Sequence, residues 1–195
     1  MNDIRRSAIF LDRDGTINEE MGYINHPGRF VLLDGVCEAI KILNENNFLT
    51  IVVTNQSGVA RGYFPLDLLH KVNERMKALL AEKGARLDAV YFCPHHPDAA
   101  IPEYRVKCDC RKPGTGLFRM AMEDFPIELE GSFVIGDRCL DMHFAHACGM
   151  PGIMVETGYG RGEMDYILPK SPYRPAVTAK DLRAAVDWII SGRQH

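Results

Sequence analysis

FLDRDGT, residues 10–16, ends a short apolar run with two aspartates that flank an arginine. The run 9–11 is apolar at every position, which is typical of a strand buried in a parallel sheet. Carboxylates repel each other and resist burial, so a buried strand that ends in Asp12 and Asp14 needs a cation or a mobile proton beside it. A plain turn before Gly15 is the alternative, because aspartate and glycine are common turn residues. The stretch therefore predicts either an acidic reactive site at the end of a strand or a simple turn.

The rest of the chain alternates between apolar runs and helical periodicity. Strands are expected at 8–11, 49–53, 89–93, 132–135 and 153–155, the last of these being the final core strand. Helices are expected at 36–45, 65–83, 115–125, 140–148 and 179–190, the last one after a polar stretch with glycines and prolines. This alternation predicts the α/β class, with one open, mostly parallel, Rossmann-like sheet flanked by helices in a single domain, 1–195.

Composition narrows the function classes. The 195 residues are 46% hydrophobic and 25% charged, and the formal net charge is −3, as in a soluble globular protein. The negative balance argues against a nucleic-acid partner. No apolar run approaches the roughly 20 residues that span a bilayer, and the first residues do not resemble a secretory signal. We therefore expect a cytoplasmic protein with neither a nucleic-acid nor a membrane partner.

Polar residues follow several of the expected strands. Asp12 comes after the first strand, Thr54 and Asn55 after the second, and Asp137 after the run FVIG, while Lys112 precedes a helix. In open α/β sheets, ligands bind beyond the carboxyl ends of the strands. We therefore expect these residues to converge on one edge of the sheet.

Such an edge suits phosphoryl chemistry. Carboxylates from two strands and a backbone carbonyl make an oxygen site suited to Mg²⁺. Asp12 is then a candidate nucleophile that forms an acyl phosphate, and Asp14 a candidate general acid and base. Mg²⁺ and Lys112 would offset the repulsion between Asp12 and an anionic phosphate.

Four motifs carry a family resemblance. DRDGT (12–16), VVTNQSG (52–58), CRKP (110–113) and VIGD (134–137) resemble, in order, the four motifs of haloacid dehalogenase-superfamily phosphatases. Within that superfamily, EEMGYI (19–24) and NQSGVARGYF (55–64) resemble the heptose 1,7-bisphosphate 7-phosphatases. Such enzymes have an open site without a separate cap domain, and the segment 17–35 is too short to form one.

The resemblance implies a role for individual residues. Asp12 would be the nucleophile and Asp14 the acid/base, while Thr54 and Lys112 would steady the transferring phosphoryl group. The magnesium ligands would be Asp12, the backbone carbonyl of Asp14, and Asp137. The substrate-binding residues would be Glu20, Met21, Gly22, Tyr23, Asn55, Gln56, Ser57, Arg111 and Arg138.

Two residues near the last motif leave questions open. Arg138 stands where a lysine is expected after Gly-Asp, which keeps the charge but changes the donor geometry. Asp141 either supports the metal-binding loop or simply opens a helix near its N-terminus.

A cysteine cluster lies in the long segment 93–113. A Cys-Pro-His triplet is followed by twelve residues and then by Cys-Asp-Cys. Two such pairs suit a closed structural zinc site, whereas reduced surface thiols are the alternative. The ligands would be Cys93, His95, Cys108 and Cys110, with the resemblance favouring His95 over the adjacent His96. Zinc would then staple the loop that delivers Arg111 and Lys112.

The resemblance implies removal of the C7 phosphate from a heptose bisphosphate, a small phosphorylated sugar, in the supply of nucleotide-activated heptose for lipopolysaccharide or another surface glycan. Histidinol-phosphate phosphatases are the nearest alternative, although their loop between the two ligand pairs is usually much shorter. A phosphatase for macromolecules and a non-catalytic, zinc-stabilised binding module are further alternatives. A monomer is expected, because the zinc loop would do the work of a cap. The sequence does not choose between the anomers at C1.

Overall fold

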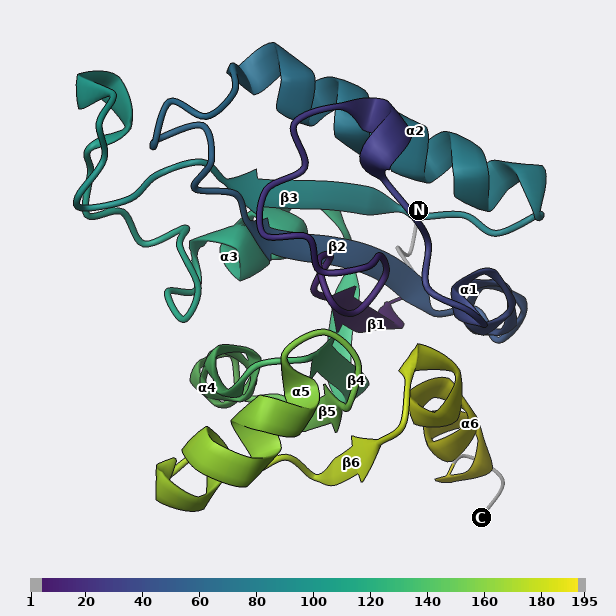
Figure 1. Cartoon of the computed structure of the whole chain (residues 1–195). Coiled ribbons are helices and arrows are strands. Elements are labelled where there is room, and N and C mark those ends of the chain that lie inside the picture. The colour runs from purple at the N-terminus through teal and green to yellow at the C-terminus, as the bar shows by residue number, and fades with distance from the viewer. Residues whose placement is uncertain (1–4, 193–195) are drawn as a thin grey trace.

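Six parallel strands form one open sheet in the computed structural model, which describes residues 5–192 (Figure 1). The strand order is β3-β2-β1-β4-β5-β6, the doubly wound order in which the chain reverses direction between β1 and β4. The strands are β1 (Arg6–Leu11), β2 (Leu49–Asn55), β3 (Ala89–Cys93), β4 (Ile127–Gly136), β5 (Gly152–Val155) and β6 (Val177–Ala179). The α/β class and the parallel sheet predicted from the sequence are confirmed.

Helices cover both faces of the sheet (Figure 1). The longer ones are α1 (Val36–Glu45), α2 (Leu66–Glu82), α3 (Gly116–Asp124), α4 (Cys139–Ala147) and α6 (Leu182–Gly192). Ile9 and Leu11 of β1 face the core shared with α1, α2 and α6, whereas Ala8 and Phe10 face α3 and α4. Side chains alternate along a strand, so an uninterrupted apolar run is what a strand with two covered faces requires.

The insertions around this sheet are short. Residues 12–35, between β1 and α1, contain one 3₁₀ turn, Pro27–Arg29, and no additional sheet or cap. The segment 94–115 contains the 3₁₀ turn Pro102–Tyr104. No helix among residues 5–192 is long and apolar enough to cross a membrane.

The C-terminal part of the sheet differs from the prediction. The expectation that 153–155 is the final strand is wrong, because β6 pairs in parallel with β5, and α6 begins only at Leu182. β6 has three residues, and its central Thr178 is exposed, so no apolar run marks it in the sequence. Its position is decided by the open edge of β5, which needs hydrogen-bond partners.

The segment between β5 and β6 is also more regular than its sequence indicates. It forms a continuous helical run of α5 (Gly160–Gly162), a π-helical turn (Glu163–Ile167) and a 3₁₀ turn (Leu168–Lys170). Figure 1 shows this run in light green beside α4, against which the π-helical turn packs. Glycines and a proline hide its helical character, because packing rather than propensity stabilises it.

Candidate active site

Three buried carboxylates meet at the switch point of the sheet. Asp12 directly follows β1, Asp137 directly follows β4, and Asp141 lies in the first turn of α4. One carboxylate oxygen from each lies within 4.8 Å of the others. The expected convergence of Asp12 and Asp137 is therefore present, and Asp141 joins them.

Lys112 lies between two of these carboxylates. Its Nζ is 2.8 Å from Oδ1 of Asp12 and 2.6 Å from Oδ1 of Asp141, and the lysine side chain is 2% exposed. Burial raises the pKa of Asp12 to about 6, although Lys112 opposes the shift. One ammonium thus faces two carboxylates, with a third close by, so the site carries excess negative charge.

Asp137 lacks a partner for one of its oxygens. Oδ2 accepts a hydrogen bond of 2.8 Å from the backbone N–H of Tyr159, whereas Oδ1 is buried without a hydrogen-bond partner. Burial, together with the neighbouring Asp12 and Asp141, raises the pKa of Asp137 to about 8. An unpartnered oxygen in a cluster of carboxylates fits a hard divalent cation such as Mg²⁺.

The backbone of Gly15 lies close to the Asp137 carboxylate. Its φ of +83° is unfavourable for other residues, and a Cβ there would collide with the Asp137 carboxylate. A Cβ at Gly158 would collide with the same carboxylate oxygen and with the Cα of Gly15. Glycine is needed at both positions because the backbone passes so close to Asp137.

Asp14 has a different environment from Asp12. Its carboxylate accepts hydrogen bonds from Arg13 at 2.9 Å, from Asn18 at 3.0 Å and from Gln56 at 2.6 Å. Arg13 is itself 2% exposed and donates to Asn73 of α2 at 3.0 Å. Sequence reasoning missed Arg13, although a charged residue between two aspartates at a buried strand end was a signal for a buried ion pair.

A cavity of about 210 Å³ opens above these groups. It is lined by most of the residues that the sequence singled out, and also by Gly58, Leu140, Asp141 and Tyr159. The predicted residues in its lining are Asp12, Asp14, Glu20, Gly22, Tyr23, Thr54, Asn55, Gln56, Ser57, Arg111, Lys112 and Arg138. Met21 and Asp137 are not among them: the Met21 side chain packs against the hydrophobic core, and Asp137 is fully buried.

Two of the lining residues also hold the site together. The Asn55 side-chain amide donates to the backbone carbonyl of Lys112 at 3.1 Å and accepts from its N–H at 3.0 Å, joining β2 to the lysine. Thr54 Oγ1 accepts from Gln56 at 3.0 Å. Asp141 pairs with Lys112 and accepts a hydrogen bond from the N–H of Arg138, which caps the start of α4; its support of the metal-binding loop stays a prediction.

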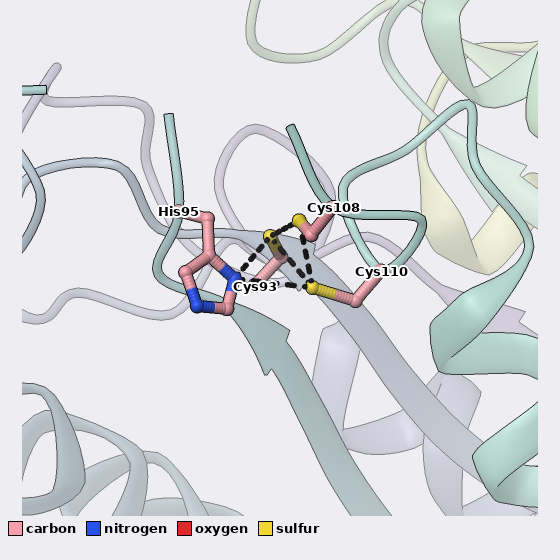
Figure 2. A group of neighbouring side chains, drawn as sticks. All are labelled: Cys93, His95, Cys108 and Cys110. Carbon is pink, nitrogen blue, oxygen red and sulfur yellow. Dashed lines mark hydrogen bonds between the residues drawn. The ribbon is translucent and has the colours of Figure 1, made fainter. Parts of the chain in front are cut away.

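The cysteine cluster forms a second candidate metal centre. Figure 2 shows the three thiols and the His95 ring converging on one point, with Nδ1 of His95 turned toward the sulfurs. The donor atoms all lie within 4.8 Å of one another, and the Cys110 sulfur is 3.0 Å from that of Cys93. Three sulfurs and one imidazole nitrogen are a suitable donor set for structural zinc. His96 points elsewhere and contacts Arg61 at 3.3 Å.

The strand order and the acidic site at its switch point define a class, the haloacid dehalogenase-like hydrolases. A family model described as HAD-hydrolase-like matches residues 109–185. The D-glycero-beta-D-manno-heptose-1,7-bisphosphate 7-phosphatase of Yersinia pestis is 39% identical over 94% of this chain and 89% of that protein. The D-glycero-D-manno-heptose-1,7-bisphosphate 7-phosphatase of Thermosynechococcus vestitus is 41% identical over 95% and 96%.

A solved structure of a heptose bisphosphate phosphatase is also similar to this chain. The D,D-heptose 1,7-bisphosphate phosphatase of B. bronchiseptica, crystallised with magnesium and phosphate, superposes with a TM-score of 0.83 at 30% identity, covering 95% of this chain and 99% of that one. The chain belongs to the heptose-1,7-bisphosphate 7-phosphatase family of haloacid dehalogenase-like phosphatases.

Proposed function

We propose that this phosphatase removes the C7 phosphate of D-glycero-D-manno-heptose 1,7-bisphosphate through an aspartyl-phosphate intermediate. The observation that carries the proposal is the buried cluster of Asp12, Asp137 and Asp141, in which Lys112 contacts Asp12 and Asp141 and these three residues line the cavity. Relatives at about 40% identity over most of the chain are named for this activity.

In the first step, an oxygen of Asp12 forms a bond to phosphorus while the bond from phosphorus to the sugar C7 oxygen breaks. Lys112 already contacts Asp12 and is placed to reduce its repulsion of the phosphate. Asp14, which lines the same cavity, donates a proton to the leaving oxygen. Thr54 and Lys112 steady the phosphoryl group in this proposal.

In the second step, water attacks phosphorus, and the bond between phosphorus and the Asp12 oxygen breaks. Asp14 accepts the proton of that water, which returns both aspartates to their starting states. The hydrogen bonds from Arg13, Asn18 and Gln56 fix the direction of the Asp14 carboxylate.

The acidic cluster fits Mg²⁺, because its donors are oxygens and Oδ1 of Asp137 lacks a partner. Asp12, Asp137 and the backbone carbonyl of Asp14 would hold the ion, which supplies positive charge against the phosphate oxygens. The relative from B. bronchiseptica was crystallised with magnesium and phosphate.

The sulfur-rich cluster fits Zn²⁺. Cys93, His95, Cys108 and Cys110 would hold it and close the loop that carries Arg111 and Lys112. In the proposed function Arg111 and Arg138 contact the substrate, and the product supplies nucleotide-activated heptose in the cytoplasm. A monomer with one catalytic domain remains the expectation.

Phosphate release in Mg²⁺ tests the proposal, with the α and β anomers of heptose 1,7-bisphosphate and histidinol phosphate assayed side by side. We expect kcat/KM for one heptose anomer to be at least about 100-fold higher than kcat/KM for histidinol phosphate. This factor corresponds to a difference of about 2.7 kcal/mol in transition-state stabilisation. A preference for histidinol phosphate would contradict the substrate assignment and leave the roles of Asp12 and Asp14 intact.

A further inference from the structure

Arg138, at the mouth of the cavity, is held by two residues that the proposed reaction does not use. Its Nε lies 3.4 Å from Oε1 of Glu163, and its guanidinium lies over the ring of Tyr159, 4.9 Å from the ring centroid. Tyr159 directly precedes the helical run after β5, and Glu163 lies within that run. This segment places an acid and an aromatic ring on two sides of one arginine.

Glu163 is the more constrained member of the pair. Its side chain is 14% exposed, against 50% for Arg138, and its Oε2 accepts a hydrogen bond of 3.0 Å from the N–H of Cys139. Glu163 is the first residue of the π-helical turn, and such turns occur frequently at functional sites. The Glu163 carboxylate is therefore held in place by the backbone on one side and contacts the more exposed arginine on the other.

The contact leaves the binding end of the guanidinium available. Glu163 engages Nε, and among residues 5–192 no hydrogen bond occupies the two terminal nitrogens of Arg138. These two nitrogens form the fork that binds a phosphate through parallel hydrogen bonds. An arginine whose rotamer is already restricted loses less conformational entropy when it binds.

The position of Arg138 indicates that its ligand would be an anionic group of the substrate. It lines the active-site cavity and also an adjacent hollow of about 530 Å³. Arg111 lines both spaces as well, and Lys170 and His143 line the hollow, where Glu163 is the one acidic residue in the lining. A second anionic group on a substrate held at Asp12 would meet the positive charges of Arg138, Arg111 and Lys170 here.

We propose that Glu163 is a positioning residue, which orients Arg138, supported by the Tyr159 ring, toward the phosphate of the substrate that is not transferred. This inference rests on the proposed function, because it needs a substrate with two phosphates. Glu163 would then contribute to substrate specificity from a segment that lies outside all four sequence motifs.

The test measures KM and kcat of E163A and E163Q on heptose 1,7-bisphosphate and on heptose 7-phosphate, which lacks the remote group. For E163A we expect KM for the bisphosphate to rise about 5-fold or more while kcat stays within about 2-fold. E163Q should fall between E163A and the wild type, because its amide oxygen still accepts the hydrogen bond. Neither variant should change KM for heptose 7-phosphate.

A double-mutant cycle separates positioning from a structural role. In an R138A background, E163A should add no further increase in KM, because the group that Glu163 orients is gone. An equal loss on both substrates, or an additive loss in the R138A background, would overturn the proposal. E163Q, which conserves size, provides the same comparison if E163A does not fold.

E156Q is the matched control. Glu156 lies in the same segment and pairs with Arg161 at 3.5 Å, on the surface and outside the lining of both spaces. Its KM values should equal those of the wild type. A wild type that cleaves heptose 7-phosphate but not the bisphosphate would refute the proposed function and this inference, whereas an active wild type with an unchanged KM in E163A would refute only the inference.

Discussion

Two aspartates one residue apart have opposite surroundings in this protein. Asp12 contacts the ammonium of Lys112 beside two other carboxylates, while Asp14 accepts hydrogen bonds from Arg13, Asn18 and Gln56. Different environments are how a site assigns different roles to identical side chains. The proposed division, with Asp12 as nucleophile and Asp14 as acid/base, rests on the family resemblance of the DRDGT motif (12–16).

At the residue scale, Asp12→Asn should lower kcat by more than about 10³-fold, because an amide does not replace a carboxylate nucleophile. The fold should persist, since asparagine has the same size and one like charge leaves the cluster. Phosphate release and thermal unfolding check both statements. Asp34→Asn, at an exposed aspartate, is the control, and turnover retained by the Asp12 variant would remove Asp12 as nucleophile.

Asn73 offers a second prediction at this scale. Asn73→Ala would leave the buried Arg13 without its 3.0 Å acceptor and should lower the free energy of unfolding by about 1–3 kcal/mol. It should also lower kcat, because Arg13 orients Asp14. Urea unfolding and steady-state kinetics test this. Lys41→Ala, at an exposed position inside α1, should change the unfolding free energy by less than about 0.5 kcal/mol, and equal effects of the two variants would contradict the argument.

At the scale of elements, the segment 94–115 is the one that sequence periodicity leaves undefined. Its middle packs on the segment after β2, where the N–H of Ile101 donates to the carbonyl of Ala60 at 3.0 Å. Its two ends meet in the sulfur-rich cluster, and Lys112 lies directly beyond. The positions of Arg111 and Lys112 therefore depend on how firmly this cluster is closed.

Removing the proposed zinc should loosen residues 93–113 before it affects the sheet. Hydrogen exchange of chelator-treated protein should rise first in that segment, and kcat should fall because misplaced phosphate contacts raise the barrier. Cys108→Ser should reproduce the effect, whereas Cys37→Ser, at the half-buried cysteine of α1, should not. Uniform loss of protection across the sheet would contradict a role confined to the loop.

At the scale of the whole molecule, the charge cluster couples stability to pH and to the cation. The pKa values of about 6 for Asp12 and about 8 for Asp137 exceed the value of 3.8 usual for an aspartate. Between pH 4 and 8 these two aspartates therefore bind more protons in the folded state than in the unfolded state. Without Mg²⁺, the free energy of unfolding should fall as pH rises through this window.

Urea unfolding at pH 5 and pH 8, with and without Mg²⁺, measures this coupling. Mg²⁺ should stabilise the protein more at pH 8, where fewer protons compete with it for the carboxylates. Asp137→Asn should lose most of both the pH dependence and the Mg²⁺ response. Stability that rises from pH 5 to pH 8 in the absence of Mg²⁺ would be inconsistent with the raised pKa values.

Much of this protein follows from sequence patterns that act over short distances. The apolar run before Asp12 predicts a buried strand because a strand with two covered faces needs apolar residues at every position. Asp12, Thr54 and Asp137 were predicted to converge because parallel strands all end at one edge of the sheet. Strand type and edge position are properties of the local chain, so the sequence by itself determined them.

Only the tertiary structure decided which residues from distant segments of the chain come into contact. β6 exists because β5 has an open edge, and Arg13 is buried because Asn73 of α2 meets it. The helical run after β5 takes its shape from packing beside α4, and this packing brings Glu163 to Arg138. No local pattern encodes these contacts, because each depends on the position of a partner far away in the chain.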